Sequence, residues 1–262
     1  MIGRKRLTPE HAAWNAAWQP PFPVPGARRF LRMPWLARRT VSPFAFQPNS
    51  SMRQFEYPWA YDQVAPHPGQ VVVDLGGALS GFQFTLAAAG ASVINVDPFL
   101  DYGGSLSYAE YVPTPQAMLS KMNRAWPGDV RLSRTTLPNA NLEPESVDVV
   151  VSVSTLEHFP PDEIADTLDS AVLALRPGGR LVLTVDLFLD LAPFTDRTEN
   201  RWGTNIDLRA LCERTGLPLV VGQPHELCGF YEFSPREVQA NLGELFVGSY
   251  PAVPQALVLQ KP

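Results

Sequence analysis

After residue 70 the chain alternates between short apolar runs and amphipathic stretches. The apolar runs have the length of β-strands and occupy residues 70–75, 92–97, 129–132, 147–153, 180–185, 217–221 and 256–260. Continuous apolar runs are typical of strands buried on both faces of a parallel sheet. Helical patterns separate them, up to residue 89 and near residues 105–111, 114–125, 161–175 and 205–215. The alternation predicts an α/β fold, a doubly wound and mostly parallel seven-stranded sheet flanked by helices.

Turn-forming residues mark the ends of several of these elements. Gly90 and Gly216 each follow a helical pattern, as expected of residues at helix C-termini. Thr204 is placed to begin the helix that ends at residue 215. Residues 176–179, Arg-Pro-Gly-Gly, predict a tight turn into the strand at 180–185.

The first 60 residues have a different character, rich in proline and tryptophan. Residues 9–19 predict a short helix with Thr8 as N-cap, on which Trp14 and Trp18 share one face. Residues 20–25, Pro-Pro-Phe-Pro-Val-Pro, exclude a helix. Four of the six tryptophans lie in this part, and a disordered tail would not carry them. We therefore predict an arm or cap over residues 1–60, packed on a second domain over residues 61–262.

Charge divides the chain unevenly. Residues 1–53 carry nine Lys or Arg and a single acid, Glu10, whereas the remainder carries 12 basic and 25 acidic residues. The basic residues of the arm have three interpretations: a solvated face leaning on an acidic body, a pocket for an anionic substrate, or a patch for a membrane surface or nucleic acid. The sequence pI of about 5.4 argues against a nucleic-acid-binding protein.

Composition excludes several classes of protein. Hydrophobic residues make up 45% of the chain and charged residues 18%, unlike a disordered chain or a collagen. No apolar run approaches the roughly 18 residues that a transmembrane helix requires. The first nine residues are followed by no apolar core, so no secretory signal is expected. Only two cysteines are present, which favours a reducing compartment, and we predict a cytoplasmic protein.

The order of elements also predicts where a ligand would bind. In doubly wound sheets, ligands lie beyond the carboxyl ends of the strands. A glycine-rich turn, residues 76–81, follows the first strand, and Asp97 ends the second, about 20 residues further on. An acid there can accept hydrogen bonds from ribose hydroxyls, so the two features together predict an adenosine-containing ligand. The turn alone could equally be structural.

Several segments in this order resemble the motifs of class I S-adenosylmethionine-dependent methyltransferases. The resemblance covers about residues 55–262, and its segments are Val72-Val73-Asp74-Leu75-Gly76-Gly77, Val96-Asp97, Ser146-Val147-Asp148-Val149-Val150, Leu156-Glu157-His158-Phe159 and Leu175-Arg176-Pro177-Gly178-Gly179. It implies a Rossmann-like methyltransferase fold whose last strand, ending near residue 260, is antiparallel. It also implies S-adenosylmethionine as cofactor and S-adenosylhomocysteine as product.

The resemblance further implies which residues meet the cofactor. Asp74 and the backbone of Gly76 and Gly77 would lie against the methionine part, and Asp97 would hold the ribose. Ala78 and Ser80 stand where the family usually has glycine, and Ser80 could donate to the cofactor carboxylate. Thr136 and Leu137, after the third strand, would meet the adenine, and Ser152 and Ser154, at the end of the fourth, would line the reacting side.

Methyl transfer to a hydroxyl benefits from a general base, whereas an amine needs only to arrive neutral. His158 is the best-placed base, although a structural role at the start of a helix is the alternative. Glu157 is interpreted mainly as a structural partner. Asp186 and Asp190 follow the fifth strand, but no matching constellation accompanies them, so no metal is predicted.

Aromatic residues are candidates for contacts with the acceptor. Tyr57 and Trp59 precede the first strand and could stack on an acceptor or face a sulfonium, or could simply pack in the arm. Trp202 lies beyond the fifth strand and could form a pocket wall. Arg53 could meet a carboxylate.

These features predict an S-adenosylmethionine-dependent methyltransferase that acts on a hydroxyl or amine of a small molecule, natural-product-like or sugar-like. Neither a nucleic-acid partner nor a membrane span is expected. Two alternatives stay open. One is a cofactor-binding protein that keeps the fold without transferring methyl groups, suggested by Ala78 and Ser80. The other is a macromolecule methyltransferase or a membrane-associated enzyme that uses the basic arm.

Overall fold

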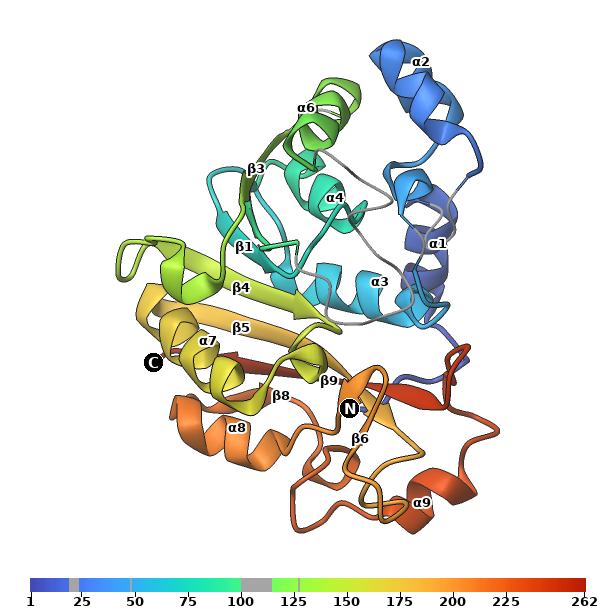
Figure 1. Cartoon of the computed structure of the whole chain (residues 1–262), viewed down its shortest axis with the longest axis vertical. Coiled ribbons are helices and arrows are strands. Elements are labelled where there is room, and N and C mark those ends of the chain that lie inside the picture. The colour runs from blue at the N-terminus through green and yellow to red at the C-terminus, as the bar shows by residue number, and fades with distance from the viewer. Residues whose placement is uncertain (19–23, 48, 100–114, 127) are drawn as a thin grey trace.

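A seven-stranded sheet forms the centre of the molecule (Figure 1). The computed structural model describes residues 1–18, 24–47, 49–99, 115–126 and 128–262. The strand order is β3-β2-β1-β4-β5-β9-β8. The bounds of these strands are β1 (Val71–Leu75), β2 (Ser92–Val96), β3 (Asp129–Ser133), β4 (Val147–Val153), β5 (Leu175–Phe188), β8 (Leu219–Val221) and β9 (Ala252–Gln260).

Strand directions follow the prediction. β1 pairs in parallel with β2 and β4, and β2–β3 and β4–β5 are parallel as well. β9 runs antiparallel between β5 and β8. The sheet is therefore mostly parallel with an antiparallel C-terminal strand, and the predicted α/β fold is confirmed.

Helices cover both faces of the sheet (Figure 1). Their bounds are α1 (Pro9–Trp18), α2 (Pro34–Thr40), α3 (Arg53–Val64), α4 (Phe82–Ala88), α6 (Pro115–Ala125), α7 (Pro161–Ala174), α8 (Leu208–Thr215) and α9 (Pro235–Ala240). One core packs α3, α4 and α6 against the face of the sheet that carries Val72, and the other packs α7 and α8 against the face that carries Val73. The apolar strands are buried on both sides, as their composition requires.

The N-terminal residues are integrated into the same structure. Thr8 accepts a hydrogen bond of 3.2 Å from the backbone N–H of His11, as expected of the N-cap of α1. The ring centroids of Trp14 and Trp18 lie 6.4 Å apart, and Trp14 also meets Tyr61 of α3 at 5.8 Å. Ile2 forms a β-bridge with Gln255 of β9. Helix α3 runs through residue 60, and the division of the chain at that residue stays a prediction.

Two boundaries differ from the sequence prediction. The predicted helix start at Thr204 is wrong, because Thr204 lies in the small hairpin of β6 (Glu199–Asn200) and β7 (Gly203–Thr204). Asp207 caps α8 instead, accepting a 2.8 Å hydrogen bond from the backbone N–H of Ala210. The tight turn predicted at residues 176–179 is part of β5, whose register against β4 shifts there.

A bulge absorbs the three extra residues of β5 without ending the strand. The helix predicted near residues 105–111 lies outside the described residues. Among the described helices, none is both long and apolar enough to span a bilayer.

Candidate functional site

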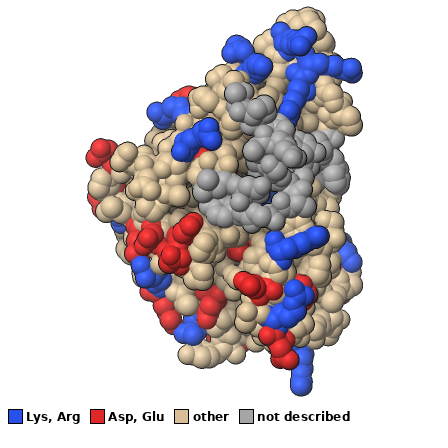
Figure 2. Space-filling model, viewed as in Figure 1, with Lys and Arg blue, Asp and Glu red and all other residues tan. Residues whose placement is uncertain are grey.

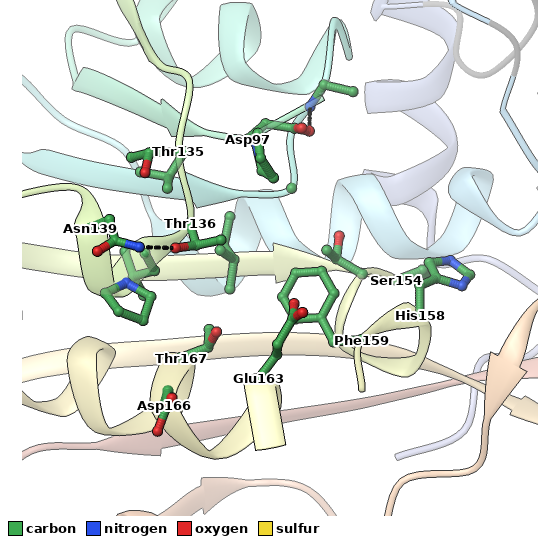
Figure 3. A pocket seen from close by; sticks show the side chains of 18 of the residues that line it. Asp97, Thr135, Thr136, Asn139, Ser154, His158, Phe159, Glu163, Asp166 and Thr167 are labelled. Atoms are coloured by element: carbon green, nitrogen blue, oxygen red, sulfur yellow. Dashed lines mark hydrogen bonds between the residues drawn. The ribbon is translucent and has the colours of Figure 1, made fainter. Parts of the chain in front are cut away.

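A cavity of about 510 Å³ opens at the carboxyl ends of the central strands (Figure 3). Its walls come from the turn after β1, the end of β2, the loop after β3, the segment after β4 and the first half of α7. The residues that line it are Arg53, Leu75, Gly76, Ala78, Val96, Asp97, Pro98, Thr135, Thr136, Leu137, Pro138, Asn139, Ser154, Thr155, His158, Phe159, Glu163, Asp166 and Thr167. Its volume is within the range of roughly 300–1,000 Å³ typical of small-molecule sites.

Asp97 ends β2 at the wall of this cavity, as the sequence predicted. Its Oδ2 accepts a hydrogen bond of 2.8 Å from the backbone N–H of Ala78, and its Oδ1 accepts one of 2.6 Å from that of Phe99. Burial raises the pKa of Asp97, although the two backbone donors oppose the shift. A carboxylate has about four acceptor positions, so both oxygens retain room for a further donor.

The turn after β1 depends on glycine at its first two positions. Gly76 has φ +70°, and a Cβ on it would overlap the side chain of Thr155. A Cβ on Gly77 would overlap the carboxylate of Asp74. Ala78 follows with φ +44°, a left-handed conformation that costs a residue with a Cβ roughly 1–2 kcal/mol. The third position thus keeps the backbone shape that glycine favours while carrying a methyl group.

Asp74 lies beneath this turn and is almost fully buried. Its Oδ2 has no hydrogen-bond partner among the described residues, and neither has Oδ1 of the neighbouring Asn95. Burial, together with the nearby charge of Asp97, raises the pKa of Asp74 to about 7. A buried carboxylate oxygen without a partner is a place where a bound cation or donor would be stabilised.

A second, smaller cavity of about 50 Å³ adjoins the first. Arg53, Gly76 and Ser154 line both cavities. Ser80 lines the smaller one, and its Oγ hydrogen-bonds the hydroxyl of Tyr57 at 3.0 Å. Burial raises the pKa of Tyr57 to about 12. Tyr57 is therefore neutral: its hydroxyl accepts from Ser80 and donates to Oδ1 of Asn49 at 3.3 Å. Tyr57 thus brings the N-terminal residues into contact with the glycine-rich turn.

The loop after β3 forms the opposite wall of the larger cavity. Thr136 and Leu137 line it as predicted, with Leu137 buried. Asn139 donates a 2.9 Å hydrogen bond to Oγ1 of Thr136 (Figure 3). This wall combines an apolar side chain with amide and hydroxyl groups, as suits the edge and face of an adenine ring.

His158 lies at the Ser154 end of the larger cavity (Figure 3). Its Nδ1 hydrogen-bonds the backbone carbonyl of Trp202. A carbonyl oxygen can only accept, so Nδ1 carries the proton in the neutral ring and Nε2 keeps its lone pair. Burial lowers the pKa of His158, and the charge of Arg53 adds to this effect. The neutral form, able to take a proton, is therefore favoured.

A buried polar network connects α3 with the ends of β4 and β5. Arg53 donates to Glu56 and, at 2.7 Å, to Oγ of Ser154. Glu56 also accepts a 2.7 Å hydrogen bond from Thr184 of β5. The hydroxyl of Ser154 lies 3.1 Å from Oδ1 of Asp186, to which it can donate a hydrogen bond. Arg53 thus lies at the junction of both cavities with its charge matched by Glu56.

Two further acids stand behind this network. Asp186 accepts from the hydroxyl of Tyr250, and its pKa is raised to about 6 by burial and by the charge of Glu56. Glu157 accepts a 2.9 Å hydrogen bond from the backbone N–H of Asp186. Burial and the charge of Asp186 raise the pKa of Glu157 well above its usual value. This position supports the structural interpretation of Glu157.

Three predicted residues lie away from both cavity linings. Ser152 is fully buried in β4, and its Oγ has no partner in the described part of the chain. Trp59 is buried in the core between α3 and the sheet. Trp202 stacks on Tyr250 with ring centroids 5.2 Å apart, and Arg201 covers it at 4.5 Å. The structure therefore places Trp202 next to His158 through the backbone, and Trp59 in a packing role.

Sequence reasoning missed the contribution of α7 to the cavity. Glu163, Asp166 and Thr167 line it from one side of this helix (Figure 3). Their spacing of three and four residues places them on one face, which is a readable signal. Glu56 was missed as well, because an acid within an aromatic segment gives no sign of a buried partner 98 residues further along the chain.

A family model described as a methyltransferase domain matches residues 73–183. This segment contains most of β1, all of β2 to β4 and most of β5, and with them every residue that lines the larger cavity except Arg53. The matched segment and the fold are consistent with a class I S-adenosylmethionine-dependent methyltransferase domain. No curated protein matches the sequence.

Solved structures with the same fold are distant in sequence from this chain. One is 1,6-didemethyltoxoflavin-N1-methyltransferase from Burkholderia thailandensis, solved with S-adenosylhomocysteine: 15% identity, TM-score 0.52, covering 99% of this chain and 94% of that one. Another is an S-adenosylmethionine-dependent methyltransferase from Mesorhizobium loti: 17% identity, TM-score 0.51, covering 79% and 97%. A third, the cyclase SpnF, has 12% identity and TM-score 0.52, and covers 79% of each chain.

The residues around the cavity fit S-adenosylmethionine as the cofactor. Asp97 offers two acceptor oxygens at the end of β2, and Asp74 has a buried oxygen without a partner at the end of β1. Thr136 and Leu137 offer a mixed polar and apolar wall. These groups can therefore bind the three parts of the cofactor: the ribose, the cationic methionine part and the adenine.

Proposed function

We propose that this protein transfers a methyl group from S-adenosylmethionine to a hydroxyl or amine of a small molecule. The observation that carries the proposal is the cavity of about 510 Å³ at the carboxyl ends of β1, β2 and β4, with Asp97 and the glycine-rich turn on one wall and His158 at one end. A ligand at this edge of the sheet is the general expectation for doubly wound folds.

The protein residues divide into those that hold the cofactor and those that meet the acceptor. Asp97 would accept the ribose hydroxyls, Leu137 would pack on the base, and ionised Asp74 would face cationic groups of the methionine part. When bound, S-adenosylmethionine supplies a methyl group already activated by its sulfonium, so the protein needs mainly to align the reactants and exclude water.

His158 is proposed as the general base for a hydroxyl acceptor. The hydrogen bond to the Trp202 carbonyl fixes the ring and leaves Nε2 free to accept a proton. Burial keeps the imidazole neutral. A positioned base of this kind contributes about 10²–10⁴-fold to proton-transfer steps.

The acceptor is proposed to bind near Arg53 and Ser154, where the two cavities meet. The Burkholderia neighbour, a 1,6-didemethyltoxoflavin-N1-methyltransferase solved with bound 1,6-didemethyltoxoflavin, supports a small acceptor. The cavity volume agrees, because it is in the range of sites for small ligands.

The first test is calorimetric titration with S-adenosylmethionine and, separately, with S-adenosylhomocysteine. Micromolar binding that Asp97→Ala abolishes would support the cofactor site. Transfer of radiolabelled methyl from S-adenosylmethionine into small molecules of a cell extract would then test the reaction. Label in protein or RNA instead would favour a macromolecule as acceptor.

One observation favours a second candidate, a cofactor-binding protein of this fold without methyl transfer. Ala78 places a methyl group in the left-handed position of the turn, on the cavity wall. A neighbour with the same fold is named as a cyclase, so the fold does not by itself imply methyl transfer. Cofactor binding without any labelled acceptor would favour this candidate.

A further inference from the structure

The end of the molecule formed by η1 (Ala27–Arg32), α2 and α6 is strongly basic (Figure 2). Six exposed cations contribute to it: Arg29, Arg32, Arg38, Arg39, Lys121 and Arg124. These three elements contain no Asp or Glu. None of the six cations forms an ion pair with any residue that the structure describes. We refer to these six residues as the basic end.

The basic end is one continuous part of the fold. Helix α2 packs against α6 and against η1, and α2 projects from the molecule beside α6 (Figure 1). Acidic side chains gather at a different part of the visible face, over the lower elements (Figure 2). The molecule is therefore polarised, and in an external field its basic end would turn toward negative charge.

Large apolar side chains are exposed next to these cations. Trp35 is 62% exposed, Met33 45% and Val24 44%. Trp35, Arg38 and Arg39 stand at positions i, i+3 and i+4 of α2, so they share one outward face of the helix. An aromatic residue beside two arginines on a projecting helix is costly to leave in water, and Trp35 belongs to none of the hydrophobic clusters formed by the described residues.

We propose that the basic end binds the anionic surface of a lipid bilayer. Lys and Arg near an anionic membrane surface each strengthen binding about fivefold, and tryptophan favours the headgroup region. Peripheral proteins combine such cations with exposed apolar side chains that enter the boundary of the acyl chains. The protein would lie on the surface without crossing it.

The exposed aliphatic residues favour lipid over nucleic acid as the partner. A nucleic-acid backbone is bound by cations and polar groups, and its bases stack on aromatic rings. Met33 and Val24 can neither pair with a phosphate nor stack as an aromatic ring on a base. Both would be buried by insertion into a bilayer. The cations also lie on a projecting helix and its neighbours, where a flat surface can reach them together.

Sedimentation with vesicles tests the proposal on the full chain. Vesicles of phosphatidylcholine with about one third phosphatidylserine should bind the protein at low salt, and vesicles of phosphatidylcholine alone should not. The double variant Arg38→Glu/Arg39→Glu should weaken binding by at least about 25-fold. Trp35→Ala, which keeps every charge, should weaken it by about tenfold.

The matched control is Arg6→Glu/Arg236→Glu. It makes the same change in net charge at two exposed arginines outside the basic end, one of them on α9. Binding that this control leaves intact would support the proposal. Equal loss in both double variants, absence of vesicle binding, or tighter binding to duplex RNA or DNA than to vesicles at the same salt would overturn it. None of these measurements depends on methyl transfer.

Discussion

Asp97 at the end of β2 accepts a hydrogen bond of 2.8 Å from the backbone N–H of Ala78 in the turn after β1. Asp97, proposed to hold the ribose, thus also fixes the glycine-rich turn, which is proposed to contact the methionine part of the cofactor. The two halves of the cofactor site are joined before any ligand binds. Changes at either residue should therefore affect the other.

Replacing Asp97 by Asn should weaken S-adenosylmethionine binding by about 10–100-fold. The amide keeps one acceptor oxygen, but its NH₂ group would face one of the two backbone donors that the carboxylate now satisfies. Losing a hydrogen bond to a charged group costs about 1.5–3 kcal/mol. Calorimetry measures the change, with Asp129→Asn on the surface as control. Unchanged affinity would remove Asp97 from the cofactor site.

Ala78→Gly should stabilise the protein and tighten cofactor binding. Glycine adopts φ +44° without the cost that a Cβ imposes, and this gain of roughly 1–2 kcal/mol outweighs the entropy lost by glycine, about 0.5–1 kcal/mol. Removing the methyl group also enlarges the cavity, which Ala78 lines. Ala117→Gly, on the exposed side of α6, should instead destabilise by about 1 kcal/mol. Urea denaturation compares the two, and destabilisation by both would contradict the expectation.

Much of the fold could be predicted from the sequence, because buried strands are continuous apolar runs and two of the helices between them end close to glycine, at Gly90 and Gly216. Asp97 and the glycine-rich turn with Ala78 were predicted because they follow β2 and β1, whereas Leu137 was predicted only from the resemblance to class I methyltransferases. The network of Arg53, Glu56 and Asp186 was not predicted from the sequence, because its members come from elements far apart in the chain. Only tertiary packing brings Glu56 to Ser154.

His158→Asn should lower kcat by about 10²–10⁴-fold with a hydroxyl acceptor and leave KM for the cofactor nearly unchanged. Asn can still donate to the Trp202 carbonyl but offers no base in place of Nε2. In the wild type, kcat should fall as pH drops through a pKa below 6.5, because burial lowers the pKa of His158. The variant should lack this limb of the pH profile. An unchanged kcat would leave His158 a structural role.

Asp74→Asn should change how stability depends on pH. The pKa of Asp74 is raised from 3.8 to about 7, so the folded state binds a proton that the unfolded state has released between these values. The free energy of unfolding therefore falls by up to about 4 kcal/mol as the pH rises from about 4 to 7. Asn cannot ionise and should escape this loss. Denaturation at pH 4.5 and 8 measures it, with exposed Asp162→Asn as control, and parallel curves for wild type and Asp74→Asn would contradict it.

Arg53→Met should destabilise the protein by about 3–5 kcal/mol. Glu56 is fully buried, and without the guanidinium its charge would be left uncompensated. The double variant Arg53→Met/Glu56→Gln should recover much of this loss, because an amide keeps hydrogen bonds with Thr184 and Ser154 without carrying charge. Arg214→Met breaks an exposed ion pair with Asp169 and should cost under about 1 kcal/mol. Urea denaturation of the wild type, Arg53→Met, Glu56→Gln, the double variant and Arg214→Met completes the comparison. Additive losses from Arg53→Met and Glu56→Gln would show that the two charges do not support each other.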